Sequence, residues 1–305
     1  MNRLSGKYPW QVMLLILPLI VVGFQFTGRV KPWLISHSAH LFSDAPYGRP
    51  QRTNTSAELF QGVIYSREVR AQPRPLVIHT VTIDLTASDI DFLVTPHDPG
   101  MEIAARTTAA FVREFGVQVA INGNYFDPFW ARTPWDYYPR SGDHVRVKGL
   151  AIANGAAYAE PLEGWPTLCF FDGRVSIDRT GCPLQTNQAL AGKEMLVESG
   201  VAVIHEKSTL HPRTAAAASI DGATLWLIVV DGRQPNYSEG VTLGELADII
   251  LELGADMALN LDGGGSSTLV MSGLLGPELL NAPIHTNVAM RQRPVANHLG
   301  IYARH

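Results

Sequence analysis

In Leu259-Asn260-Leu261-Asp262-Gly263-Gly264-Gly265-Ser266-Ser267-Thr268, an apolar run stops at an asparagine and then turns through three glycines. A second stretch, Ala120-Ile121-Asn122-Gly123-Asn124-Tyr125-Phe126-Asp127, has the same form well upstream. Each predicts a strand that delivers amide, carboxylate and hydroxyl groups to one edge of a sheet. Because such groups are costly to bury for packing alone, we expect both strand ends to bind a polar ligand.

Apolar spacing predicts two helices and many strands along the rest of the chain. The helices are expected at 103–115 and 243–253, the second capped by Thr242, and each is followed by a glycine, a strand and an asparagine. This shared unit predicts an α+β fold, with a mixed β-sheet core and packed helices in a single large domain. Strands are expected at 58–69, 76–85, 90–94, 117–121, 149–153, 167–171, 175–177, 195–204, 214–220, 224–230, 257–261, 268–271 and 298–302.

The N-terminal segment differs from the rest. Arg3 and Lys7 precede an apolar stretch at 12–24, and no charged residue follows until Arg29. We therefore expect residues 1–30 to be a signal peptide or a membrane anchor, which would place the large domain outside the cytoplasm. Residues 31–74 read as a linker and the first strand, and residues 75–305 as the main domain.

The hydrophobic fraction and the net charge of the chain indicate which kinds of partner to expect. With 46% hydrophobic residues the chain can bury a real core. A formal net charge of −4 and the lack of any Lys/Arg run argue against nucleic-acid binding. The membrane is expected as a partner only through the N-terminal segment.

The two cysteines flank a predicted hairpin. Cys169 and Cys182 lie on either side of a stretch that turns at Asp172-Gly173. In an exported protein a disulfide closing this short loop is expected, and two buried free thiols are the alternative.

The glycine-rich loop suits an anion. Gly263, Gly264 and Gly265 could bring backbone N–H groups against a phosphate, with Ser266 and Ser267 beside them. The stretch fits neither a Walker loop nor a nucleophile elbow, because the required Lys and Gly-x-Ser-x-Gly spacing are missing. A plain tight turn is the alternative.

Four arginines stand at or near predicted strand ends, and together they would make an anion site. They are Arg213, Arg233, Arg291 and Arg293. A guanidinium can bond two phosphate oxygens at once, although a lone surface arginine often has no such role.

Acid–base and metal chemistry rest on fewer residues. Asp262 and Asp231 are the leading acid–base candidates, with Asp127 behind them. The histidine spacing argues against zinc, whereas the oxygens of Asp262 and Asn260 would suit Ca²⁺ or Mg²⁺ if a metal is bound. The aromatic stretch 125–138 could stack on a sugar, or pack as a small core under a loop.

Six blocks of sequence, taken in order, resemble the phosphodiester glycosidase domain family. The resemblance spans roughly 75–303 and rests on Asn122-Gly123-Asn124-Tyr125-Phe126, His211-Pro212-Arg213-Thr214-Ala215, Asp231-Gly232-Arg233, 238–247, 260–268 and Arg293-Pro294-Val295-Ala296-Asn297. It implies an exported hydrolase that cleaves a sugar–phosphate diester and leaves a phosphomonoester.

The resemblance also implies which residues form the site. It implies site residues without assigning their individual roles: Asn122, Arg213, Thr214, Asp231, Arg233, Asp262, Ser266, Ser267 and Arg293. Of these we expect Asn122, Arg213, Thr214, Asp231 and Asp262 to be catalytic, and Arg233, Ser266, Ser267 and Arg293 to bind the phosphate. Asn124 and the three glycines are expected beside them. We expect Asp231 to orient Arg213 or Arg233, and Asn122 to hold a sugar hydroxyl. Two alternatives remain open: a non-catalytic module that binds an envelope glycan or teichoic-type polymer, and a phosphodiesterase that cuts at phosphorus.

Overall fold

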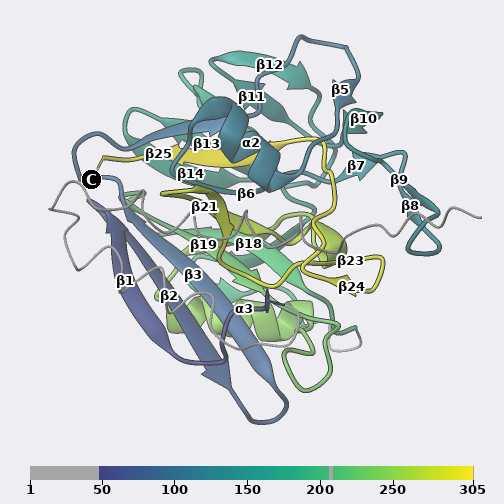
Figure 1. The fold of residues 1–305 in the computed structure, drawn as a ribbon. Helices are drawn as coiled ribbons and strands as arrows, with labels where there is room; N and C mark the ends of the chain where they lie inside the picture. The colour runs from purple at the N-terminus through teal and green to yellow at the C-terminus, as the bar shows by residue number, and fades with distance from the viewer. Residues whose placement is uncertain (1–47, 206–208, 305) are drawn as a thin grey trace, which may run out of the picture. The chain divides into compact units, whose positions relative to one another are not determined.

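Antiparallel β-sheets make up most of the computed structural model, which describes residues 48–205 and 209–304 (Figure 1). Strands account for 44% of the chain and helices for 9%. Within the described part, all ladders between strands are antiparallel, and the α-helices are α2 (Thr108–Phe115) and α3 (Leu243–Glu252). The predicted α+β class with a mixed sheet is therefore wrong, because the chain returns through hairpins and short loops rather than helical crossovers.

The largest sheet carries three of the strand ends that matter for the site. Its register runs continuously from β2 to β20, and β18 lies between β19 and β20. In spatial order its eight strands are β1 (Thr55–Phe60), β2 (Val63–Arg70), β3 (Leu76–Asp84), β19 (Thr224–Val230), β18 (Arg213–Ala218), β20 (Met257–Asn260), β16 (Glu194–Glu198) and β17 (Val201–Ala202).

Two five-stranded sheets follow. The first is β22 (Gly276–Leu279), β21 (Leu269–Gly273), β6 (Val119–Asn122), β25 (His298–Tyr302) and β4 (Asp91–Val94). The second is β12 (Ala156–Ala159), β11 (Ala151–Ala153), β15 (Gln188–Ala191), β13 (Thr167–Phe171) and β14 (Arg174–Asp178).

Smaller ladders complete the fold. A three-stranded sheet contains β5 (Ile103–Ala104), β10 (His144–Val147) and β7 (Phe126–Asp127). Two hairpins stand apart: β8 (Trp130–Ala131) with β9 (Tyr137–Tyr138), and β23 (Ile284–His285) with β24 (Val288–Ala289).

The main core lies between the eight-stranded sheet and the two five-stranded sheets. Alternate residues of β18 show this division, because Ala216 packs into that core while Ala215 packs with Leu246 of α3 on the opposite face. Helix α2 covers the other side of the β6–β25 sheet, where Phe111 packs on Ala120. Figure 1 shows the two helices on the outer faces of the stacked sheets. These layers hold the ends of β6, β18 and β20 in fixed positions.

Local signals explain where the elements depart from the sequence-based ranges. Helix α2 begins five residues later than predicted, since Ile103–Ala104 pairs with β10 and Thr107 supplies the N-cap. Helix α3 begins as predicted, with a capping box between Thr242 and Glu245. The predicted strands 58–69 and 195–204 are each hairpins, which turn at Gly62 and Gly200 with positive φ.

The cysteines form the disulfide that the sequence favoured. Cys169 on β13 is bonded to Cys182, beyond the hairpin partner β14. The hairpin turns at Asp172 and Gly173, both with positive φ, as expected for an Asp-Gly turn. The predicted signal or anchor at 1–30 lies outside the described residues. Among the residues that are described, no helix combines the length and the apolar character needed to cross a membrane.

Candidate active site

One asparagine joins the strand ends that carry the site. Asn122, the last residue of β6, accepts hydrogen bonds from the hydroxyl of Thr214 at 2.9 Å and from the backbone N–H of Thr268 at 3.2 Å. Its own amide donates to the carbonyl of Asp262 at 2.6 Å. Asn122, Thr214 and Thr268 are fully buried, so these bonds fix the backbone of the glycine-rich loop. The amide predicted to hold a sugar hydroxyl is occupied within the protein.

Two of the three glycines leave space for an arginine side chain. A methyl group on Gly265 would lie 2.6 Å from Nη2 of Arg293, and one on Gly264 would lie 3.1 Å from Nη2 of Arg233. At Gly263 a methyl group would lie closest to the carbonyl oxygen of Pro212, at 3.0 Å, while Cδ of Arg213 would be 3.8 Å away, an ordinary contact. Of the three, Gly264 alone also has a positive φ, of 61°. The structure therefore brings three of the predicted arginines together around the loop.

Neutral acceptors hold the guanidinium groups. Arg293 donates to the hydroxyl of Ser266 at 3.0 Å and to Nδ1 of His285 at 3.3 Å. Arg233 donates to Nδ1 of His211 at 3.0 Å. In the part of the chain that the structure describes, neither Arg233 nor Arg293 has a carboxylate within ion-pair distance. Their positive charge is therefore available to an anionic ligand.

Arg213 is held by the backbone. Its Nε donates to the carbonyl of Val241 and its Nη2 to the carbonyl of Thr209, each at 3.2 Å. The arginine is buried, and these bonds fix its direction beside the loop.

The electrostatics of the cluster show mutual repulsion. Burial lowers the pKa of Arg293 to about 10, and the nearby Arg233 adds to that effect while Asp262 opposes it. The pKa of Arg233 is also lowered, by burial first and then by Arg213. Burial lowers the pKa of His285 to about 3, so this imidazole is neutral and can accept from Arg293 at ordinary pH. Packing three cations at short range is unfavourable, which favours binding of an anion.

Asp262 is the carboxylate inside this cluster. Its Oδ2 accepts a hydrogen bond from the Ser266 hydroxyl at 2.5 Å, and the residue keeps partial access to solvent. Burial raises the pKa of Asp262 above its usual value, although Arg293 and the Ser266 hydroxyl oppose the shift. A carboxyl group with a raised pKa beside an anion site is suited to proton transfer.

Asp231 faces a different part of the molecule. Its buried carboxylate accepts hydrogen bonds from Asn281 at 3.0 Å and from the backbone of Ala282 at 2.9 Å, and lies 2.9 Å from Nε2 of His79. His79 in turn meets the hydroxyl of Tyr65 at 2.9 Å. The structure therefore places Asp231 in a buried polar network, and the expected contact with Arg213 or Arg233 is not formed. Asp127, the weakest acid candidate, pairs with Lys148 at 3.1 Å.

The loop contributes fewer free donors than its glycines suggest. The backbone N–H of Gly264 donates to Pro212, that of Ser266 to Gly263, and that of Ser267 to Gly264. Ser267 is buried, and its carbonyl accepts from Asn281. Side chains of arginine, rather than a cradle of backbone amides, therefore supply most of the positive potential.

Asn124 joins the segment after β6 to the backbone at 148–150 and to Asn297. Its amide nitrogen donates to the carbonyls of Lys148, Gly149 and Leu150, and its oxygen accepts from Asn297 at 3.1 Å. The residue is 1% exposed, so its contacts lie within the protein.

Arg291 does not join the other arginines. It donates to the carbonyl of Pro134 and to the hydroxyl of Tyr137, and its guanidinium lies over the Tyr137 ring at 4.5 Å. These contacts attach the β8–β9 hairpin to the body of the protein. The same hairpin region reaches the site through Phe129, whose ring centroid lies 4.1 Å from Cζ of Arg293. The aromatic stretch therefore packs against arginines, and Phe129 is exposed.

Several residues of the site carried little or no signal in the sequence. His211 begins the His-Pro-Arg-Thr block, which gives no sign that its imidazole lies beside Arg233. His285, in contrast, stands in no motif. Glu194 also stands in no motif, although its Oε2 accepts from the Asn260 amide at 2.8 Å. Long-range contacts place these side chains, and local patterns do not report them.

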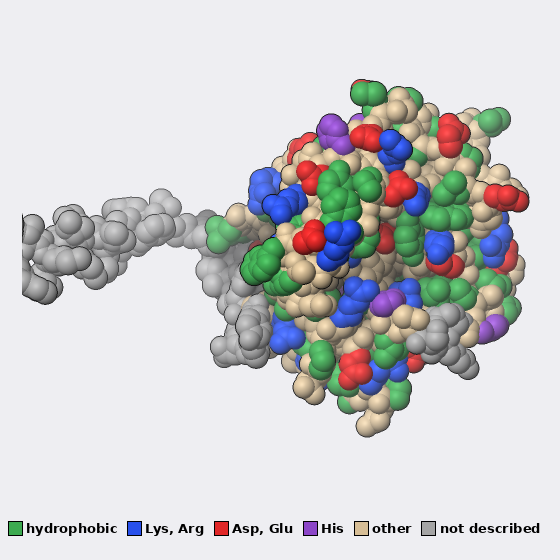
Figure 2. All heavy atoms as spheres, turned by 90° about the vertical axis from the view of Figure 1, so that its right-hand side faces the viewer, with side chains coloured by type: hydrophobic (Ala, Val, Ile, Leu, Met, Phe, Trp, Pro, Cys, Tyr) green, Lys and Arg blue, Asp and Glu red, His purple; other side chains and the backbone are tan. Residues whose placement is uncertain are grey.

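The site opens at the surface on one side. Arg233 is exposed, whereas Asp262, Gly263 and Gly264 are partly exposed. In the space-filling view, Lys and Arg side chains and a histidine lie together near the centre of one face (Figure 2).

Within residues 48–205 and 209–304, no three His, Cys, Asp or Glu side chains are grouped as a metal site. Asn260, the second residue considered for a metal, instead donates to Tyr125 and Glu194.

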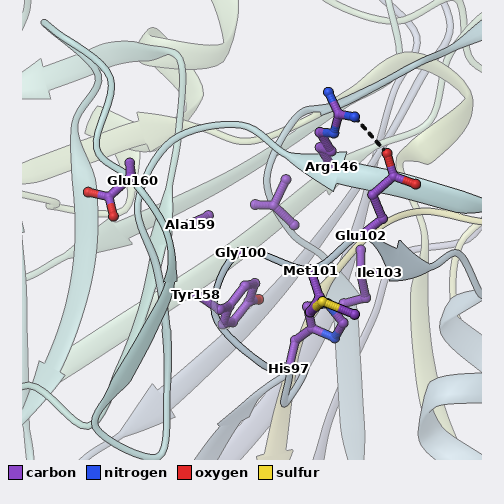
Figure 3. A pocket seen from close by; sticks show the side chains of 10 residues that line it. His97, Gly100, Met101, Glu102, Ile103, Arg146, Tyr158, Ala159 and Glu160 are labelled. Atoms are coloured by element: carbon purple, nitrogen blue, oxygen red, sulfur yellow. Dashed lines mark ion pairs between the residues drawn. The ribbon is translucent and has the colours of Figure 1, made fainter.

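A separate cavity of about 170 Å³ contains none of the predicted site residues. His97 and Tyr158 form one wall, edge to face, and a Glu102–Arg146 ion pair stands at its rim (Figure 3). The hydroxyl of Tyr158 accepts from Asn297, which also contacts Asn124. Buried hydrogen bonds of Asn297 thus connect Tyr158 in the cavity wall with Asn124.

Similarity to known proteins shows the family to which the chain belongs. A sequence model described as phosphodiester glycosidase matches residues 115–302, which is more than half of the chain. The chain belongs to the phosphodiester glycosidase family. Membership supports a hydrolase of the phosphodiester glycosidase type at the level of the family. No curated protein matches it.

Solved structures show the same fold at low identity. The catalytic domain of zebrafish N-acetylglucosamine-1-phosphodiester alpha-N-acetylglucosaminidase has a TM-score of 0.57 at 18% identity, covering 83% of this chain and 88% of that one. A hypothetical protein from Synechocystis has a TM-score of 0.64 at 15% identity, covering 86% of this chain. This chain spans 65% of the length of the Synechocystis chain.

Proposed function

We propose that this chain hydrolyses a glycosyl phosphodiester at the bond between sugar and phosphate, releasing the sugar and leaving a phosphomonoester. One observation carries the proposal: Arg213, Arg233 and Arg293 surround a loop that starts with a partly exposed aspartate of raised pKa. The cations fit the phosphate, and Asp262 fits the proton transfer that hydrolysis requires.

The charge balance of this reaction favours such a cluster. A phosphodiester carries one negative charge, whereas a phosphomonoester carries about −1.5 to −2 at pH 7. Negative charge therefore grows on the phosphate as the bond to the sugar breaks. Fixed guanidinium groups stabilise the transition state more than the bound substrate, which is the condition for catalysis.

Asp262 supplies the acid–base function in this proposal. When protonated it can donate to the departing phosphate oxygen, and when ionised it can accept a proton from the attacking water. The Ser266 hydroxyl, which also accepts from Arg293, holds one carboxylate oxygen in place. Removing the Ser266 hydroxyl would therefore loosen both Asp262 and Arg293.

Hydrolysis in water enriched in ¹⁸O tests the bond that breaks. Cleavage at the sugar carbon places the label in the released sugar, and the phosphomonoester stays unlabelled. Label in the phosphate would show a phosphodiesterase that cuts at phosphorus. A protein that binds a chromogenic glycosyl phosphodiester but releases no product would be a glycan- or teichoic-type-polymer-binding module instead.

We also propose that the chain acts outside the cytoplasm on an envelope substrate, joined to the membrane or exported through residues 1–30. The Cys169–Cys182 disulfide supports this location, because such bonds persist in oxidising compartments. Fractionation of cells that express the full chain tests it. Recovery of the protein in the cytosolic fraction with both thiols reduced would contradict this part of the proposal.

A further inference from the structure

A second polar cluster lies beside Asp262, on strands that the arginines do not use. Asn260 ends β20 and is paired in register with Glu194, the first residue of β16. The Asn260 amide nitrogen donates to Oε2 of Glu194 at 2.8 Å and to the hydroxyl of Tyr125 at 2.9 Å. One buried asparagine therefore fixes an acid and a phenol next to each other.

The cluster lies within electrostatic reach of the catalytic aspartate. Asp262 follows Asn260 by two residues, and its charge raises the pKa of the Tyr125 hydroxyl, after burial as the main cause. Glu194 raises the same pKa and Arg213 lowers it. The Tyr125 hydroxyl is therefore close enough to Asp262, Glu194 and Arg213 to feel the charge of all three.

The hydrogen bonds leave one acceptor and one donor for a ligand. Both N–H groups of Asn260 are used, and the Tyr125 oxygen accepts one of them. In the described part of the chain no acceptor takes the proton of the Tyr125 hydroxyl. Glu194 is 25% exposed, and its second oxygen lies 3.6 Å from Lys193 Nζ. A carboxylate that accepts and a phenol that donates are therefore both available.

An aromatic ring borders this pair. Trp165 meets Tyr125 edge to face with ring centroids 5.6 Å apart, and it stays partly exposed. Gly149 leaves room beside this ring, since a methyl group there would lie 2.6 Å from Cβ of Ala191 and 3.1 Å from the Trp165 ring. Sugar subsites in proteins combine polar groups of this kind with an aromatic wall.

We propose that Glu194 and Tyr125 form the sugar-binding half of the site, that Asn260 positions both, and that the sugar they take is uncharged. This inference rests on the proposed function. Sugar hydroxyls can donate to Glu194 and accept from Tyr125. A sugar that carries a carboxylate would place it near both Glu194 and Asp262, and these like charges would repel it. The substrate then lies with its phosphate on the arginines, its neutral sugar on Glu194, and Asp262 at the bond between them.

The test compares two substrates that differ only in the charge of the sugar: a neutral hexosyl and the matching hexuronosyl phosphodiester of one chromogenic alcohol. We expect the wild-type chain to prefer the neutral substrate at least tenfold in kcat/KM. Glu194→Gln keeps an oxygen for the Asn260 amide, so the fold is retained while the repulsion is removed. It should shift the preference towards the uronosyl substrate about tenfold, a change of about 1.4 kcal/mol. Tyr125→Phe should raise KM for both substrates.

Glu198→Gln is the matched control, because Glu198 ends the same strand with a side chain that is 42% exposed and pairs with Arg179. It should leave the preference unchanged. A Glu194→Gln enzyme that behaves like this control would overturn the sugar subsite and leave the hydrolase proposal standing.

Calorimetry with neutral hexose 1-phosphate and hexuronic acid 1-phosphate gives the same comparison without turnover. Tighter binding of the neutral compound, lost in Glu194→Gln, supports the subsite even if no diester is cleaved. Equal binding of both compounds by the wild type would overturn it. Failure to hydrolyse any diester, with binding intact, would instead count against the proposed reaction.

Discussion

Asp231 and Asp262 end neighbouring parts of one sheet, and each follows an apolar strand, yet the structure gives them opposite surroundings. Asp231 is 1% exposed and receives bonds from Asn281 and Ala282, beside His79. Asp262 is partly exposed, bonds to one serine hydroxyl and lies among arginines that have other acceptors. A carboxylate saturated with donors is a structural anchor, whereas one left underbonded can exchange protons.

The comparison also separates two ways of using positive charge. Around Asp231 the neighbours are neutral donors or a histidine, and the network is closed. Around Asp262 the cations have no carboxylate partner of their own at Arg233 and Arg293, within the described residues. The first arrangement favours stability of the fold. The second favours binding, because cations without a carboxylate partner repel one another and are stabilised when an anionic ligand binds.

The largest expected effect is on catalysis at Asp262. Asp262→Asn removes the proton-transfer group but keeps its size, so kcat should fall by about 10³-fold. Hydrolysis of a chromogenic glycosyl phosphodiester measures this, and circular dichroism checks the fold. Asp248→Asn, on the exposed side of α3, is the control and should keep full activity. Activity retained in Asp262→Asn would remove this residue from the mechanism.

Asp231→Asn should act on stability instead. The new amide would place N–H groups against Asn281 and the backbone of Ala282, leaving buried donors facing donors. We expect the free energy of unfolding to fall by about 3 kcal/mol. Urea unfolding measures it, while kcat of the folded fraction should stay within a few-fold of the wild type. A large drop in kcat without loss of stability would contradict the distinction between the two aspartates.

A smaller effect is expected from changing one arginine. Arg293→Lys keeps the charge but loses the planar fork that reaches Ser266 and His285, and kcat/KM should fall by about 10²-fold. The matched control is Arg291→Lys, since Arg291 contacts Pro134 and Tyr137 rather than the loop. Equal losses in both variants would show that the arginines act through general charge and not through position.

The smallest expected effect is a pH dependence of stability. Burial raises the pKa of Asp262 in the folded state, so its contribution to stability is present below its unfolded pKa and is lost as pH rises through the folded value. Asp262→Asn has no such loss. The variant should therefore gain stability relative to the wild type as pH rises from about 3 to about 7 in urea titrations. A difference that shrinks with rising pH would show that the arginines outweigh burial.

The sequence predicted local elements well where one signal dominated. Glycine after each helix, the Asp-Gly hairpin and the Thr242 cap all mark boundaries with a clear physical cause, and β13, β19 and β25 have the predicted bounds. The fold class was wrong because periodicity identifies strands but does not report how they pair. Two helices among many strands suggested crossovers, and the actual connections are antiparallel.

The candidate site was predictable as a set of residues and not as a set of roles. Motif order gathered the glycines with Arg213, Arg233 and Arg293, because the family resemblance contains those blocks. The partners of Asp231 and Asn122 come from segments that are distant in sequence, so their buried bonds could not be seen. His285 and Glu194 were missed for the same reason, since each is placed by the pairing of strands.

The glycine triplet makes the loop open to stepwise engineering. Adding one methyl group at position 264 or 265 would press on Arg233 or Arg293 respectively, at 3.1 and 2.6 Å, whereas one at position 263 would meet the carbonyl oxygen of Pro212. The closest, at position 265, should displace its guanidinium furthest. Gly264→Ala and Gly265→Ala would therefore each move one cation while every charge is conserved, and Gly263→Ala provides a comparison in which the backbone is pressed instead.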